Sequence, residues 1–463
     1  MQGNTLMRSL YSGMFLALVL TFAAGAAAQP KKDLKKAKDL IDQADAFIAQ
    51  KNYREAADRY GQAIVIAPVN SYAHFWKGYS HFSLNEPDQA LSEFSLALSQ
   101  GFKPFEIYRV RSYIYITQKK YDLALDDLGK ALEIEPRNAR LLHALGDVYV
   151  FKNQLKDALN TYQRASAIAP ENGDIYYNIA RVEQGLGDAK AQGTAAQEAI
   201  SKGTQMMGEA YYLLGDASQK QKNIPAAIDA YQKAINVKPD SYVVYGNLAD
   251  IYRSEGRFTD AINLSKQAIV RYPNDGGLYA NISWYYSLAD RSEDAIQAAK
   301  AGISLSPDNA LAYTNLCRAY NDAKQYQLAI VACNNALRLS PKDGETNFYL
   351  GRSYDFLNKP KEATKYYERA VTGLVDFTNR TPEYSDGFYL LGNAYFSTNQ
   401  SDNAIAAYNK CLALSPRFAK ARFNLGTIYV LKGNKNAAME QYSSLLKLDA
   451  ALAEKLKAQI DKM

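Results

Sequence analysis

Prolines recur every 34 residues along much of this chain, and this period limits the possible folds more than any other feature. The two runs are Pro136 and Pro170, then Pro239, Pro273, Pro307 and Pro341. A fixed period of about 20 to 50 residues indicates repeated supersecondary units, because a unit that small cannot bury its apolar face alone. We therefore expect the 463 residues to form an array of stacked units, and not one large globular core.

Several units carry the same order of residue types. A small residue is followed by a second small residue, an aromatic residue, a third small residue and then the proline. Three examples are Gly146, Ala158, Tyr162, Ala165 and Pro170; Gly215, Ala227, Tyr231, Ala234 and Pro239; and Gly392, Ala404, Tyr408, Cys411 and Pro416. Small residues at helical spacing let two antiparallel helices approach closely, an aromatic ring fills the gap beside them, and proline ends the second helix. The pattern predicts a helix-turn-helix hairpin.

The pattern resembles the tetratricopeptide repeat over nearly all of residues 37–452. The family's first-helix motif recurs as Leu142, Leu145, Gly146 and Tyr149; Phe388, Leu391, Gly392 and Tyr395; and Arg422, Leu425, Gly426 and Tyr429. The resemblance implies an all-α, right-handed superhelical solenoid of about twelve hairpins. The units are expected to start near residues 37, 71, 105, 139, 173, 208, 242, 276, 310, 344, 385 and 419. It also implies a scaffold that binds peptides or protein segments in a concave groove.

Two units depart from the period. The unit from Gly173 to Met207 has one extra residue and lacks the usual aromatic residue and proline. Seven extra residues lie near Asp376–Tyr384, where we expect a longer loop. Residues 451–463 repeat an apolar residue every four positions and predict a helix that caps the array.

The N-terminus is typical of an exported bacterial protein. Arg8 precedes an apolar run, and Ala26, Ala27 and Ala28 follow at the place where a signal peptidase would cut. We predict a signal peptide over residues 1–28 with cleavage after Ala28, a basic leading segment over 29–36, and a periplasmic or secreted protein. An uncleaved membrane anchor is the alternative. No later stretch is long and apolar enough to be an integral membrane segment.

The residue inventory argues against catalysis. There are three histidines, of which His74 and His81 lie on one helix face, and packing accounts for them better than metal binding does. Motifs that cradle phosphate or expose a nucleophilic serine are absent from the sequence. The 54 basic and 48 acidic residues are interleaved, which does not suit a nucleic-acid surface. We predict no enzyme, cofactor, metal or nucleic acid. Two alternatives to the binding scaffold stay open: a rigid spacer in an envelope export or secretion assembly, and an accessory that presents substrates to a separate enzyme.

One candidate site is an asparagine ladder. Asn247, Asn281 and Asn315 are 34 residues apart, and Asn178 and Asn424 hold the equivalent place in other units. Because an amide both donates and accepts, the ladder is predicted to bind the main chain of an extended peptide. Arg318 and Arg352, also 34 apart, would favour acidic segments. Alternatively, each asparagine only ties its helix to the preceding turn.

Two further groups of residues carry predictions. Tyr72, Phe75, Tyr79 and Phe82, with Tyr113 in the next unit, would form an aromatic anchor for a partner, or else pack against the leading segment near Leu40 and Ile41. Cys317 and Cys333 occupy the first small place and the aromatic place of one hairpin. A disulfide between them is sterically plausible, whereas Cys411 has no such neighbour; the alternative is two small core residues.

Overall fold

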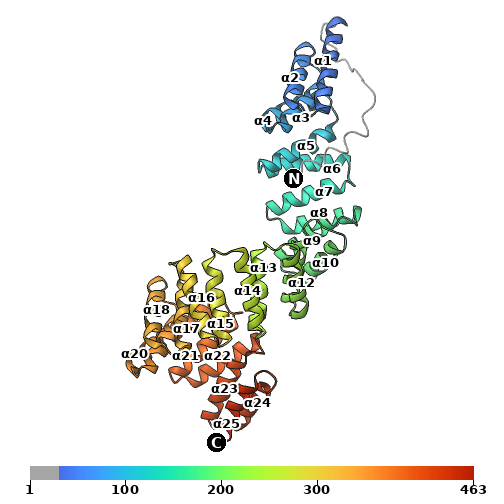
Figure 1. Cartoon of the computed structure of the whole chain (residues 1–463). Coiled ribbons are helices and arrows are strands. Elements are labelled where there is room, and N and C mark those ends of the chain that lie inside the picture. The colour runs from blue at the N-terminus through green and yellow to red at the C-terminus, as the bar shows by residue number, and fades with distance from the viewer. Residues whose placement is uncertain (1–30) are drawn as a thin grey trace. The chain divides into compact units, whose positions relative to one another are not determined.

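The computed structural model describes residues 31–463, so the predicted signal peptide and cleavage site lie outside the described residues. The described residues form 25 α-helices and no β-strand (Figure 1). Consecutive helices pair through short connections, which forces each pair to run antiparallel. The all-α solenoid of about twelve hairpins is therefore confirmed. The helices fall into two compact units, one ending at Glu171 and one from Asn172 to Met463.

The first unit contains four hairpins. Their helices are α1 (Lys31–Ala49), α2 (Tyr53–Ile66), α3 (Ser71–Ser83), α4 (Pro87–Ser99), α5 (Pro104–Thr117), α6 (Tyr121–Ile134), α7 (Ala139–Phe151) and α8 (Leu155–Ile168). Because α1 begins at Lys31, most of the predicted leading segment belongs to the first helix and does not form a separate segment.

The second unit contains eight hairpins and one final helix. Its helices are α9 (Gly173–Leu186), α10 (Ala189–Ser201), α11 (Met207–Lys220), α12 (Ile224–Val237), α13 (Tyr242–Ser254), α14 (Phe258–Arg271), α15 (Gly276–Leu288), α16 (Ser292–Leu305), α17 (Ala310–Asp322), α18 (Tyr326–Leu339), α19 (Gly344–Phe356), α20 (Pro360–Arg380), α21 (Ser385–Ser397), α22 (Ser401–Leu414), α23 (Ala419–Leu431), α24 (Lys435–Leu445) and α25 (Ala450–Ile460). In α25, Leu456 and Ile460 are fully buried against α23 and α24, so this helix covers the apolar end of the last hairpin.

The turn inside each hairpin contains one residue with positive φ. These residues are Lys51, Asn85, Lys119, Asn153, Gly187, Lys222, Gly256, Asp290, Lys324, Asn358, Asn399 and Gly433. A residue in the left-handed region reverses the chain after the first helix. Eight of the twelve are Asn, Asp or Gly, the residue types that tolerate this conformation best.

In hairpins that have a glycine at the first small place and a tyrosine at the aromatic place, the tyrosine ring packs on that glycine. A Cβ atom added to Gly392 would lie 2.6 Å from the ring of Tyr408, and one added to Gly351 would lie 2.8 Å from the ring of Tyr367. The tyrosine hydroxyl can also form a hydrogen bond with the first helix. The Tyr162 hydroxyl donates to the Asp147 carboxylate at 2.6 Å. Tyrosine suits this place because its ring is buried while its hydroxyl reaches a polar residue on the first helix.

The irregular unit at Gly173 is a complete hairpin, α9 and α10. Ala196 occupies the aromatic place of this hairpin, and Gln192 occupies the second small place. It is fully buried, and its Nε2 donates at 2.8 Å to the Leu213 carbonyl and at 2.8 Å to the Asp216 carboxylate. These two hydrogen bonds join α10 to α11, the first helix of the next hairpin.

The loop expected near Asp376–Tyr384 is a prediction that was wrong. Helix α20 continues to Arg380 and has 21 residues, whereas α18 and α22 each have 14. The extra turns persist because Leu374 and Thr378 extend the buried stripe that Tyr367 and Ala370 begin. The insertion is a helical extension that delivers residues 381–384 to a new place.

Candidate protein-binding groove

The first helices of the hairpins in the second unit form one face, here named the first-helix face. An aromatic cleft of about 410 Å³ opens on this face at α19, α21 and α23. Residues of α19 to α23 and α25 line it: Phe348, Tyr349, Arg352, Phe356, Tyr367, Tyr389, Asn393, Phe396, Ser397, Tyr408, Phe423, Asn424, Thr427 and Gln459. Most of these side chains are aromatic. Such rings provide large contact area at a small cost in side-chain entropy, which is typical of protein-binding surfaces.

Polar groups in this aromatic cleft are partly satisfied within the chain. Asn424 Nδ2 donates to Asn393 Oδ1 at 2.8 Å and to the Tyr408 hydroxyl at 3.3 Å. By contrast, Thr427 Oγ1 and Gln459 Oε1 are buried without a hydrogen-bond partner in the chain. A bound main chain would supply the donors and acceptors that these two groups lack.

Arg352 contributes a positive charge to the same cleft. Its side chain is 35% exposed, and its Nη1 lies 3.4 Å from the Asp322 carboxylate. Since that pair is long and partly solvated, the guanidinium retains the capacity to bind a carboxylate from a partner.

A second group of residues on this face, here named the arginine cluster, consists of Arg253, Trp284, Arg318, Tyr384 and Asp386. Arg253 is paired with Asp386 and Asp250, and Arg318 with Glu345. Burial by itself lowers the pKa of Arg253, but the two carboxylates outweigh it and raise that pKa. Burial raises the pKa of Tyr384, so its hydroxyl stays protonated. This cluster therefore holds fixed opposite charges in a dry environment.

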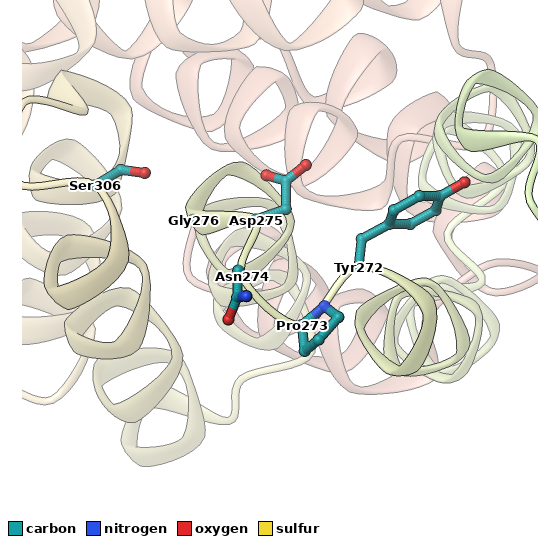
Figure 2. Close-up of a pocket in the computed structure, with 6 residues that line it drawn as sticks. All are labelled: Tyr272, Pro273, Asn274, Asp275, Gly276 and Ser306. Atoms are coloured by element: carbon teal, nitrogen blue, oxygen red, sulfur yellow. The ribbon is translucent and has the colours of Figure 1, made fainter.

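A separate recess of about 540 Å³ lies at the turn between α14 and α15 (Figure 2). Two of its polar side chains are engaged within the chain: Asp275 caps α15 by accepting from the backbone N–H groups of Gly277 and Leu278, and the Tyr272 hydroxyl donates to the Asp240 carbonyl at 2.7 Å. A Cβ atom on Gly276 would lie 2.8 Å from the Gly302 carbonyl oxygen. This recess is formed by the turn between α14 and α15 and by Ser306.

Family models described as tetratricopeptide repeat or TPR repeat match most of the chain. The matched residues are 41–106, 115–182, 208–241, 244–277, 283–344, 345–372, 392–433 and 419–452. The chain is a tetratricopeptide repeat protein.

Relatives of this tetratricopeptide repeat protein match only parts of it. Small glutamine-rich tetratricopeptide repeat-containing protein 2 of Saccharomyces cerevisiae is 30% identical over 28% of this chain and 43% of its own length. Anaphase-promoting complex subunit 3 of Schizosaccharomyces pombe is 24% identical over 30% of this chain and 21% of its own. The chain thus spans less than half the length of these relatives. The solved structure of yeast Tom70 covers 84% of this chain and 96% of its own at 15% identity and a TM-score of 0.37.

The tetratricopeptide array does not present its asparagines uniformly. Asn315 is buried, and its Nδ2 donates to the Ala280 carbonyl of the preceding first helix at 2.8 Å. The Asn315 amide is therefore engaged within the array, and its bond joins α17 to α15, whereas the alternative interpretation expected a bond to the preceding turn. Asn281 and Asn178 are half-buried, and Asn247 Nδ2 donates to the Tyr231 hydroxyl at 3.5 Å. Among the ladder residues, only Asn424 lines the aromatic cleft.

The two predicted arginines have different environments. Arg352 lines the aromatic cleft, whereas the Arg318 side chain is only 7% exposed. The Arg318 guanidinium lies over the rings of Trp284, at 5.4 Å, and Tyr349, at 5.3 Å. Sequence spacing placed both arginines correctly on the first helix but missed the rest of the aromatic cleft, apart from Asn424. Asn393, one residue after the small Gly392, carried the clearest missed signal, since a polar residue recurs there as Asp147.

The predicted aromatic anchor is divided between core and surface. Phe75 is buried and stacks on Phe102 at 4.3 Å, so its role is packing. The Tyr72 hydroxyl donates to the Asp45 carboxylate at 3.1 Å. Tyr79 contacts Phe82, and Phe82 meets Tyr113 at 5.7 Å, where Tyr113 is 44% exposed. An anchor that includes Phe75 is therefore excluded, because that ring is inside the core.

His74 and His81 lie beside carboxylates, and two of the three cysteines form a disulfide. His74 Nδ1 lies 2.6 Å from Glu93 Oε2, and His81 Nδ1 lies 2.7 Å from Glu86 Oε2. No group of three or more potential metal ligands occurs within residues 31–463. Cys317 and Cys333 are joined as a disulfide with their Cα atoms 5.2 Å apart, and Cys411 is buried and free. Across the same described range, none of the helices combines the length and apolarity needed to cross a membrane.

Proposed function

We propose that this chain is a non-enzymatic scaffold that binds a protein segment in the aromatic cleft. The observation that carries the proposal is the combination, in one cleft, of aromatic walls, the exposed guanidinium of Arg352 and the unpartnered polar atoms of Thr427 and Gln459. Rings supply contact area, while the polar groups engage the main chain or a carboxylate of the partner. A relative that is a subunit of the anaphase-promoting complex supports a role in holding other proteins.

Affinity capture with cleft variants tests this proposal. Arg352→Ala and Phe396→Ala remove a charge and a 38% exposed ring from the cleft, and Leu431→Ala removes a 68% exposed side chain of α23 that does not line it. We expect a partner whose capture drops about tenfold or more with either cleft variant and is unchanged by the control, since a hot-spot residue contributes about 2 kcal/mol or more. If capture survives both cleft variants and is lost on deletion of α1 and α2, the chain acts as a spacer through its end.

We also infer that the protein is exported. Arg8, the apolar run from Met14 to Leu20 and the three alanines before Gln29 support this inference. Expression of the full chain in a bacterial host, followed by fractionation and intact mass, tests it. A mature chain that begins at Gln29 in the periplasm or medium is expected, whereas an uncut chain in the membrane fraction would favour the anchor.

A further inference from the structure

Arg253 and Asp386 are 133 residues apart in sequence and form an ion pair on the first-helix face. Their side chains are only 5% and 8% exposed. Arg253 lies in the last turn of α13 and Asp386 in the first turn of α21, where each charge also suits its helix dipole. In a simple solenoid each hairpin contacts only its neighbours, so a pair that spans several hairpins is an addition to the repeat.

Tyr384 accompanies Asp386 in this contact. Its ring lies 5.2 Å from the guanidinium carbon of Arg253 and 6.3 Å from the ring of Trp284. Trp284 in turn has the guanidinium carbon of Arg253 at 4.9 Å and that of Arg318 at 5.4 Å. Helices α13, α15 and α17 thus provide two cations and an indole ring, and residues 384–386 provide a phenol ring and a carboxylate.

The extended helix α20 is what brings this segment to the face. Phe377, in the added turns, meets the Tyr384 ring at 5.8 Å, and its own ring fills the space beside Gly387, where a Cβ atom would come within 2.8 Å. The second helices α18 and α22 end seven residues sooner and carry no equivalent. The insertion therefore lengthens α20 and so displaces the connecting turn, residues 381–384, which itself has the same four-residue form as the turn at residues 340–343.

Arg318, on the side of the contact that faces Tyr384 and Asp386, has hydrogen-bond donors that this turn does not use. Nε and Nη1 of Arg318 have no hydrogen-bond partner in the chain, although the side chain is more than nine-tenths buried. A guanidinium with unpaired donors beside an aromatic ring favours a carboxylate or main-chain carbonyl.

We propose that Tyr384–Asp386 is an intramolecular ligand of the arginine cluster, and that the same cluster binds, in competition with it, a partner segment carrying an aromatic residue two positions before a carboxylate. This inference goes beyond the proposed function, because the arginine cluster is separate from the residues that line the aromatic cleft. The chain's own segment defines the chemistry: a ring to lie against Trp284 and an anion to pair with Arg253. When Tyr384 and Asp386 occupy the arginine cluster, fewer protein molecules have an unoccupied cluster. The apparent affinity for the partner is therefore lower.

Peptide binding in solution tests the proposal. The probe is a fluorescein-labelled peptide with the sequence of Thr381–Phe388, measured by fluorescence anisotropy. The protein variant Tyr384→Ala/Asp386→Asn empties the cluster, and we expect it to bind the probe about tenfold or more tightly than the wild type does. The gain should disappear when Trp284→Ala is added, and when the probe itself carries the Asp386→Asn change. Equal affinity of wild-type and emptied protein, or equal affinity for both probes, would overturn the proposal.

Hydrogen exchange on the wild-type protein gives an independent answer, including the case in which the emptied variant does not fold. Excess unlabelled peptide should speed deuterium uptake in residues 381–390 of the chain, because displacement exposes those amides. The matched peptide with the Tyr384→Ala change should have no effect. Unchanged uptake at saturating peptide would overturn the proposal. The affinity-capture experiment with Arg352→Ala does not use this peptide. If a partner is captured through the aromatic cleft but the peptide has no effect, only the intramolecular ligand is rejected. If no partner depends on the cleft and the peptide has no effect, the proposed function is rejected as well.

Discussion

Cys333 lies where other hairpins have a tyrosine, and its sulfur is bonded to Cys317, which lies where those hairpins have a glycine. The two places are 16 residues apart in this hairpin, as they are for Gly215 and Tyr231. A covalent bond therefore replaces the packing of a ring on a glycine between α17 and α18. The bond and its surroundings lead to the first prediction.

We expect native protein purified without reductant to contain one free thiol, that of Cys411. Burial raises the pKa of this thiol, so it should react with an alkylating agent only after unfolding. Replacement of both Cys317 and Cys333 by Ala should cost about 3 kcal/mol, the loop-closure value for a loop of about 15 residues. Intact mass before and after reduction checks the thiol count, and three alkylated thiols in unreduced protein would contradict the bond.

Substitution of Gly146 should destabilise the first unit. An added Cβ atom would overlap the ring of Tyr162, so Gly146→Ala is expected to lower the free energy of unfolding by about 1 to 3 kcal/mol. Gly129→Ala is the matched control, because nothing lies within 4 Å of its added Cβ atom in α6. There the substitution should stabilise by about 0.5 to 1 kcal/mol. Urea unfolding of both variants tests the contrast, and similar changes in the two would argue against close packing.

Phe75→Ala and Tyr113→Ala should separate core from surface in the aromatic set. Removal of the buried Phe75 ring is expected to cost about 3 to 5 kcal/mol, because it leaves a cavity beside Phe94 and Phe102. Tyr113 is 44% exposed, so its replacement should change stability by less than about 0.5 kcal/mol. Thermal melting compares the two. A well-folded Phe75→Ala protein would reopen an anchor role for that ring.

Asn315→Ala should act on stability, and Asn424→Ala on binding. Loss of the bond from Asn315 to the Ala280 carbonyl should cost about 0.5 to 1.5 kcal/mol, the net contribution of one hydrogen bond. Asn424 lies at the aromatic cleft, and its replacement should weaken a captured partner. Urea unfolding and partner capture are measured for both variants. Weaker capture by a fully stable Asn315→Ala protein would restore Asn315 to the ladder.

The first unit should lose stability in acid through Glu93. Burial alone raises the pKa of this carboxyl, but hydrogen bonds from His74 and Lys77, with their charges, lower it below the ordinary value of 4.5. Because the folded pKa lies below the unfolded one, the stabilisation is full above pH 4.5 and is lost as the pH falls through the folded pKa. Glu93→Gln should be less stable at pH 7 and should show a shallower acid decline. Urea midpoints between about pH 7 and 3, read from Trp76 fluorescence in a Trp284→Phe background, test this linkage; parallel curves for the two proteins would contradict it.

The sequence alone determined the helical hairpin, because the contacts that stabilise a hairpin join residues close together in the sequence. The small place at Gly146 and the ring at Tyr162 are 16 residues apart in one hairpin, and their packing needs only two helices and a short turn. The same spacing recurs in register, so the fold class followed from the period. Local spacing also placed Cys317 opposite Cys333, where the structure has a disulfide.

Only the tertiary structure decided which of the repeated side chains are available to a partner. Asn281 and Asn315 hold the same place in sequence, yet the Asn315 amide is bonded to the Ala280 carbonyl. The contact of Arg253 with Asp386 depends on how the small rotation of each hairpin on the next accumulates along the array. The accumulated rotation depends on many packing contacts between hairpins. A sequence pattern that describes a single hairpin therefore cannot predict it. The sequence predicted a loop at the insertion near residue 376. In the structure the added residues continue the buried stripe of α20 as helix, and Phe377 in these added turns contacts Tyr384.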